Sequence, residues 1–175
     1  MVGVLAGFLA VWASATVYLI GARPSWRHWS TALSFFACAV SLGVATSLCL
    51  EQGWAVAGSG SILAARVVAL VGVIGLAVAE WRRMAYLRSG LPEARQTYGL
   101  LRQEYRQRWF VGLLLRVALA GVLVVASFFL PGLIFVAWVV LAAGVVLERH
   151  LFFVTALPLT LHSEVRGGRV AWSTL

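Results

Sequence analysis

The sequence predicts an all-α fold, a polytopic bundle of transmembrane helices with five spans. Hydrophobic residues make up 62% of the 175-residue chain and charged residues only 11%, whereas a soluble domain has about 25% charged residues. The apolar residues also gather in long runs, and a helix needs about 20 of them to cross the hydrocarbon core of a bilayer. We therefore predict a single transmembrane domain over residues 1–175.

Each predicted span is a run of apolar residues long enough to cross a bilayer as a helix. Arg66 interrupts the third run and Arg116 interrupts the fourth. Leu130-Pro131-Gly132 divides the last uncharged stretch into two spans, because Pro and Gly end helices. The five predicted spans are 2–21, 31–50, 58–79, 109–130 and 132–152.

The segments that connect these spans alternate in charge. Arg residues gather in segments 22–30 and 80–108 and in the tail after residue 153, whereas the other two connections carry one Glu or no charge. Five crossings place all three Arg-bearing segments on the same side of the membrane. By the positive-inside rule, we predict that this basic side is cytoplasmic.

Residues 92–108 are predicted to form a short amphipathic helix on the cytoplasmic side. Pro92 suits the first turn of a helix, and Ala94, Tyr98, Leu101 and Tyr105 follow it at helical spacing. The Arg residues beside this apolar stripe suit two roles, attraction to anionic lipid headgroups or docking of a soluble partner. The residues predicted to dock a partner are Arg82, Arg83, Arg95, Arg102, Arg106 and Trp26.

Two Arg residues lie inside predicted spans. Arg66 and Arg116 are each flanked by apolar residues on both sides. Charges within a membrane are costly, and those that persist often bind a ligand or move protons. The alternative is that each side chain extends along its helix to reach the membrane surface.

Three ionisable residues in a row, Glu148, Arg149 and His150, come at the end of the last predicted span. A quinol site needs an apolar cleft and a proton-accepting group near one membrane surface. These side chains offer an acceptor, a cation and a base that titrates near neutral pH. We therefore predict that they form part of a quinol site. The alternative is a charged helix end, in which Glu148 pairs with Arg149 and faces lipid headgroups.

The sequence favours neither a metal or haem site nor a catalytic site in this chain. A membrane haem b usually needs two His on facing helices, and only His150 is near a span. No Cys/His pair has the spacing of metal ligands, and there is no catalytic triad or phosphate-binding loop. The net charge of +8 does not indicate nucleic-acid binding, because the Arg residues lie where membrane topology requires them.

Three stretches resemble the membrane anchor subunits of dimethyl-sulfoxide-reductase-type molybdoenzymes. They are VYLIGARPSWRHWSTALSFFACAVSLG (17–43), TYGLLRQEYRQRWFVGLLLRVALAG (97–121) and AAGVVLERHLFF (142–153). The last stretch departs from the family at two positions. Val145 stands where the family has a Glu, and Glu148 stands where the family has a second Gly. The positions that match the family's motifs are Tyr18, Pro24, Trp26, Phe35, Phe36, Gly43, Gly144, Arg149, Phe152 and Phe153.

This resemblance implies a function and a set of partners. Such anchors bind menaquinol or ubiquinol as an exchangeable substrate and pass electrons to a ferredoxin-like iron–sulfur subunit, which feeds a molybdopterin catalytic subunit. The anchor itself binds no cofactor. The implied location is the cytoplasmic (inner) membrane of a bacterium or archaeon. The candidate quinol-binding residues are then Arg149, His150, Glu148, Arg116 and Tyr18.

The resemblance leaves open how the complex is composed and on which side its soluble subunits lie. The family's anchors have eight helices, and this chain resembles the fourth to the eighth. The first half then belongs to a separate chain, or the start is truncated or misassigned. In the best-known members the soluble subunits lie outside the cytoplasm, whereas the positive-inside rule places the docking side of this chain in the cytoplasm.

Two other functions stay open at this point. The chain could be a purely structural anchor or assembly subunit, whose basic helix recruits a soluble enzyme without any quinone chemistry. It could also be a small transporter in which Arg66 and Arg116 line a substrate path. The sequence shows neither the broken helices nor the inverted repeats typical of transporters.

Overall fold

The computed structural model describes residues 2–19, 26–54 and 59–155, and within these ranges the chain forms helices and no strands. The prediction of an all-α fold is confirmed for this part of the chain. In order, the helices are α1 (Val2–Tyr18), α2 (Trp29–Trp54), α3 (Ser59–Ser89), α4 (Pro92–Gln103), α5 (Arg106–Leu113), the π-helical segment η1 (Leu114–Leu119), α6 (Ala120–Ala126) and α7 (Leu133–Val154).

Four helical columns are long and apolar enough to cross a membrane, as expected of a multi-pass membrane protein. They are α2, α3, the continuous column α5–η1–α6, and α7. The first predicted span forms α1, a shorter apolar helix of 17 residues. Four of the five predicted spans are therefore long enough to cross a membrane. Residues 20–25, which include Arg23, and the tail after residue 155 lie outside the described residues.

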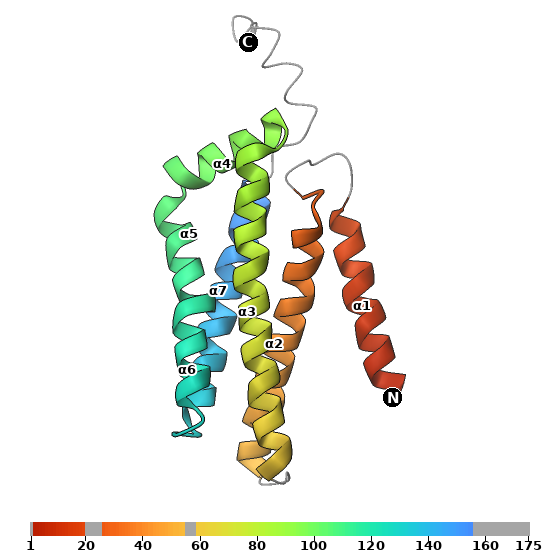
Figure 1. The fold of residues 1–175 in the computed structure, drawn as a ribbon, viewed down its shortest axis with the longest axis vertical. Coiled ribbons are helices and arrows are strands. Elements are labelled where there is room, and N and C mark those ends of the chain that lie inside the picture. The colour runs from red at the N-terminus through yellow and green to blue at the C-terminus, as the bar shows by residue number, and fades with distance from the viewer. Residues whose placement is uncertain (1, 20–25, 55–58, 156–175) are drawn as a thin grey trace, which may run out of the picture.

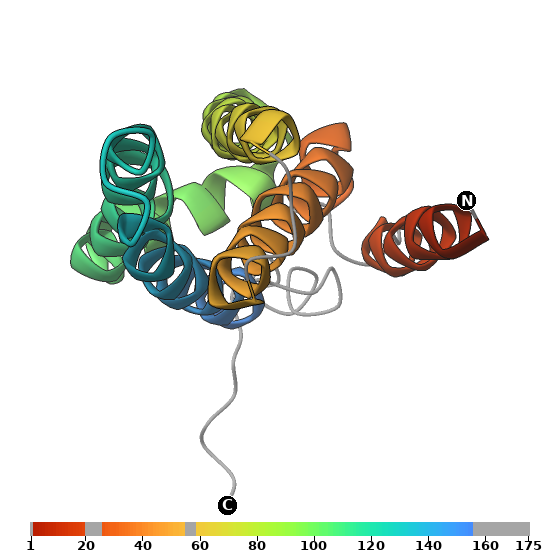
Figure 2. The same cartoon turned by 90° about the horizontal axis from the view of Figure 1, so that it is seen from below.

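The four long columns run side by side, and α4 crosses one end of them between α3 and α5 (Figure 1). Seen along the columns, α1 stands at the edge of the group, where it packs on α2 (Figure 2). Exposed Arg residues gather at the end that α4 crosses, and we call it the basic end. They are Arg27, Arg82, Arg88, Arg95, Arg102, Arg106 and Arg108.

Small side chains allow the columns to approach closely. The core between α2, α3, η1–α6 and α7 contains Ala37, Cys38, Leu76, Ala120 and Leu141. Close backbone approach is how helices associate in lipid, where the hydrophobic effect provides no attraction between them. Gly72 of α3 shows this packing, since a Cβ placed there would lie 2.9 Å from the backbone nitrogen of Ser41 on α2.

The helix of the third predicted span extends past the predicted C-terminal end of the span. Residue 79 was expected to end the span, but α3 continues to Ser89. The helix stops where the Gly90 N–H donates to the Tyr86 carbonyl at 2.7 Å. Leu91 is then extended, with ψ at 157°, as is usual for a residue that precedes proline. Glu80 and Arg83 therefore belong to a membrane helix and not to a connecting segment.

The predicted amphipathic helix over 92–108 forms, but it is shorter than expected. It ends at Gln103, and Tyr105 interrupts the helical path with φ at −108° and ψ at 14°. Arg106 then begins the α5 column. Its apolar stripe faces the bundle, because Ala94 and Leu101 are buried against Leu87 of α3 and Leu151 of α7.

Candidate functional site

The main candidate site is a ring of four buried charges near the basic end, between α3, η1 and α7. The Arg116 guanidinium lies 2.5 Å from a Glu80 carboxylate oxygen and 3.4 Å from Glu148. Arg83 completes the ring, at 3.2 Å from Glu148 and 3.9 Å from Glu80. All four side chains are buried, and Arg116 is only 2% exposed. Two Arg and two Glu alternate around the ring, so their formal charges cancel.

Local helix geometry places these four side chains. Glu80 and Arg83 are three residues apart on α3 and so share one helix face. Arg116 lies within η1, and π-helical turns are frequent at functional positions in helices. Glu148 comes one turn after Gly144 on α7. A Cβ at Gly144 would lie 2.7 Å from the Arg116 backbone nitrogen, so the glycine lets α7 approach close enough for Glu148 to reach Arg116.

Two neighbouring side chains extend the ring toward the protein surface. The Trp109 indole N–H donates to a Glu80 oxygen at 2.8 Å, which gives that oxygen a partner outside the ring. On the opposite side, Arg149 Nε lies 3.5 Å from Glu148. With Arg149 included, three Arg accompany two Glu, and the enlarged cluster carries one net positive charge.

Arg149 lies between the ring and an aromatic cluster that is formed between α1, α2 and α7. Its guanidinium lies 3.9 Å from the centroid of the Phe35 ring, close enough for a cation–π interaction. Tyr18 stacks on Phe35 with 5.2 Å between ring centroids, and it meets Phe152 edge-on at 5.9 Å. Trp26 stacks on Phe152 at 4.8 Å. Side chains from residues 18–35 therefore lie together with side chains of α7, more than 100 residues later in the sequence.

The ring leaves almost no free space for a ligand. The cavity beside it measures ≈ 10 Å³ and is lined by residues that include Arg83, Trp109, Arg116 and Glu148. That volume is about the space of one water molecule. Among the described residues, no group of three His, Cys, Asp or Glu side chains is placed to hold a metal ion.

The predicted quinol residues occupy three different environments. Glu148 and Arg116 meet in the buried ring, and Arg149 and Tyr18 meet at the aromatic cluster through Phe35. His150 does not join them and is exposed. Consecutive residues on an α-helix point about 100° apart, so Glu148, Arg149 and His150 cannot all face one site.

Some of the predicted docking residues are exposed and others are buried. Arg82, Arg95, Arg102 and Arg106 are exposed at the basic end, but the prediction was wrong for Arg83 and Trp26, which are buried. Arg83 turns inward because α3 continues past residue 79 and brings it to Glu148. Trp26 is covered because it stacks on Phe152 and donates a hydrogen bond of 3.4 Å to the Phe152 carbonyl.

Two further ionisable residues lie apart from the ring. The Arg66 guanidinium is 5.7 Å from the centroid of the Phe128 ring, and Arg66 precedes Glu80 on α3 by about 20 Å along the helix. At the basic end, His28 stacks on Tyr86 with 4.5 Å between ring centroids. Partial burial and the nearby Arg82 guanidinium lower the pKa of His28, so His28 is neutral at pH 7.

Sequence reasoning missed Glu80 and Trp109. Glu80 was assigned to a connecting segment, although its spacing from Arg83 is that of a helical ion pair. Arg116 also pointed to a missing partner for itself, because it lies in an apolar run and a cation in a membrane needs a carboxylate or a carbonyl partner.

Comparison of the chain with models of known protein families, with curated proteins and with solved structures finds no match.

Proposed function

We propose that this chain is the membrane anchor subunit of a molybdopterin/iron–sulfur oxidoreductase. In this proposal a ferredoxin-like iron–sulfur subunit docks at the basic end and exchanges electrons with the quinone pool through the anchor. The molybdopterin catalytic subunit binds to the iron–sulfur subunit. The protein lies in the inner membrane of a bacterium or archaeon, with its basic end in the cytoplasm.

The position of α4 is the main support for the docking role. This helix lies across the end of the membrane columns and is held by its buried residues Ala94 and Leu101. Its residues Arg95 and Arg102 remain exposed. A rigid helix with a cationic outer surface suits an acidic soluble partner, since complementary charge speeds association and fixes orientation.

The quinol role is best supported at Arg149. Glu80 and Arg116 are buried within the ring, whereas the Arg149 side chain is 21% exposed and lies beside aromatic rings that suit a flat headgroup. A guanidinium can donate hydrogen bonds to a quinone oxygen. The neighbouring Glu148 Oε2 lies 3.5 Å from Arg149 Nε, and this ion pair holds the Arg149 side chain beside the aromatic rings. Electrons released from the quinol would pass to the docked subunit at the same end.

Replacing Arg149 by Gln is expected to lower quinol oxidation by the assembled complex. A hydrogen bond to a charged group contributes about 1.5–3 kcal/mol, which corresponds to a loss of roughly 10- to 100-fold. His150→Gln is the matched control, because this neighbour is exposed on another side of α7. Turnover is measured with a reduced quinol analogue, and assembly is checked by size-exclusion chromatography.

Unchanged turnover in Arg149→Gln, with assembly intact, would favour the alternative function. The chain would then be a purely structural anchor or assembly subunit without quinone chemistry. The closed ring of ion pairs suits that function as well, because it fixes three helices against one another without binding a ligand.

The proposed orientation predicts which segment a protease can reach. In sealed inverted vesicles the cytoplasmic surface faces outward. The interruption between α4 and α5, at residues 104–105, should therefore be cleaved there and protected in right-side-out vesicles. Protection of this segment in inverted vesicles would place the basic end outside the cytoplasm.

A further inference from the structure

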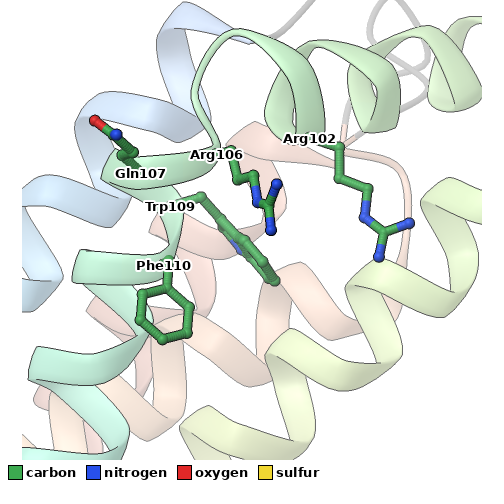
Figure 3. A pocket seen from close by; sticks show the side chains of 5 residues that line it. All are labelled: Arg102, Arg106, Gln107, Trp109 and Phe110. Carbon is green, nitrogen blue, oxygen red and sulfur yellow. The ribbon is translucent and has the colours of Figure 1, made fainter.

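An open groove lies beside the place where α4 ends and α5 begins. Its volume is ≈ 700 Å³, and it is lined by Arg102, Arg106, Gln107, Trp109 and Phe110. Figure 3 shows Arg102, Arg106, Trp109 and Phe110 extending to the same side, while Gln107 points away from them. The groove therefore presents two guanidinium groups next to two aromatic rings.

The two cations of the groove are available for an anionic ligand. Both Arg102 and Arg106 are exposed, and neither takes part in the ion pairs found among the described residues. Arg102 packs over the Tyr98 ring at 5.7 Å, which steadies its side chain. The nearest acidic residue along the chain, Glu104, lines a neighbouring hollow that also includes Arg106, but it forms no ion pair with Arg102 or Arg106 among those found in the described residues.

The groove continues into a surface of the protein that faces lipid. Phe110 begins an exposed apolar strip, and Leu114 follows one helical turn later with 45% of its surface exposed. Both residues belong to the membrane column Arg106–Ala126. A ligand that occupies the groove therefore meets cations at the membrane surface and an apolar helix face below them.

We propose that this groove binds one anionic membrane phospholipid. Arg102 and Arg106 hold its phosphate, since guanidinium groups match phosphate oxygens in a planar, two-pronged geometry. Trp109 packs beside the headgroup region, where Trp is enriched in membrane proteins. The acyl chains follow Phe110 and Leu114 into the bilayer. A soluble anion would use the two Arg side chains but not the apolar strip.

The groove also touches the buried ring of charges. Trp109 lines the groove and donates its indole N–H to Glu80. A lipid packed against this indole restricts its motion and so preserves the hydrogen bond to the ring. Lipid binding is therefore expected to raise the midpoint of thermal unfolding, because a ligand that binds only the folded state stabilises it.

The test uses the purified chain alone in an uncharged detergent, without any partner subunit. Phosphatidylglycerol and phosphatidylcholine are titrated separately, and bound lipid is counted by native mass spectrometry. We expect phosphatidylglycerol to bind more tightly and to raise the unfolding midpoint. The double variant Arg102→Gln/Arg106→Gln should weaken phosphatidylglycerol binding by at least ~10-fold. The matched control is Arg88→Gln/Arg95→Gln, which removes two exposed charges outside the groove.

Three outcomes would overturn the proposal. Equal binding of the two lipids by the unmodified chain would show that no anionic site exists, and this result needs no variant to fold. Equal losses in the two double variants would show a diffuse attraction of the basic end. Displacement of the lipid by millimolar inorganic phosphate would show a site for a free anion. Because no partner is present, each result leaves the docking proposal separately testable.

Discussion

Replacing Glu80 by Gln is expected to lower the free energy of unfolding by about 3–5 kcal/mol, the usual cost of breaking a buried ion pair from one side. Glu80 faces Arg116 at 2.5 Å and Arg83 at 3.9 Å. Gln keeps the size of the side chain and can still accept the Trp109 hydrogen bond, but it removes the charge. Two buried Arg residues then share the single carboxylate of Glu148. The measurement is unfolding by SDS titration in mixed micelles.

Two further variants show whether the loss arises from the ring. Glu104→Gln removes a carboxylate from an exposed position and should change stability by less than about 0.5 kcal/mol. Glu80→Gln/Arg116→Gln removes one charge of each sign, so it should be less destabilising than the sum of the two single variants. If Glu80→Gln behaves like Glu104→Gln, the ring does not stabilise the bundle.

Gly144→Ala is expected to destabilise the protein by about 1–3 kcal/mol, which is typical of overpacking in a tight core. The added methyl group would lie 2.7 Å from the Arg116 backbone nitrogen and 2.8 Å from its Cβ. Backbone atoms cannot rotate away, so α7 and η1 must separate. The separation also lengthens the contacts between Glu148 and Arg116.

Gly43→Ala is the matched control for Gly144→Ala. Both glycines lie within helices that are long and apolar enough to cross a membrane, but nothing lies within 4 Å of a Cβ at Gly43. This variant should be neutral or slightly stabilising, because Ala has the higher helix propensity. Equal effects of the two substitutions on the unfolding transition would show that close approach at Gly144 is not required.

Sequence patterns predicted the fold class because a bilayer imposes simple rules on length and polarity. Runs of apolar residues located all four long columns, and Pro131-Gly132 correctly separated α6 from α7. The third span was predicted to end at residue 79 because charged residues follow it, whereas α3 continues to Ser89. Glu80 and Arg83 continue that helix, since charges supplied by η1 and α7 neutralise theirs.

The candidate site was only partly predictable, because its members come from separate helices. Arg116 and Glu148 were predicted to be functional from their unusual positions in apolar runs. Their contact depends on how α7 packs against η1, and a single sequence does not contain this information. The grouping of Glu148, Arg149 and His150 failed for a simpler reason. Neighbours in sequence point in different directions on a helix, and His150 points away from the other two.

The ring and Arg149 have different roles in the proposed mechanism. The ring contains equal numbers of Arg and Glu, so it can lie within the bundle and hold α3, η1 and α7 together without a net charge. Arg149 is the fifth charge and adds one positive charge at the edge of this group. A cation that is partly exposed beside aromatic rings is suited to binding an electron-rich oxygen, as the quinol proposal requires.

The account is tested most directly by isolating the native complex from membranes. The chain carries an affinity tag and is purified in a mild detergent, and the copurifying subunits are identified by mass spectrometry and assayed for iron, acid-labile sulfide and molybdenum. The account predicts a soluble subunit with iron–sulfur clusters and a second one with molybdenum. Purification of the chain alone, or with partners that contain neither, would contradict it.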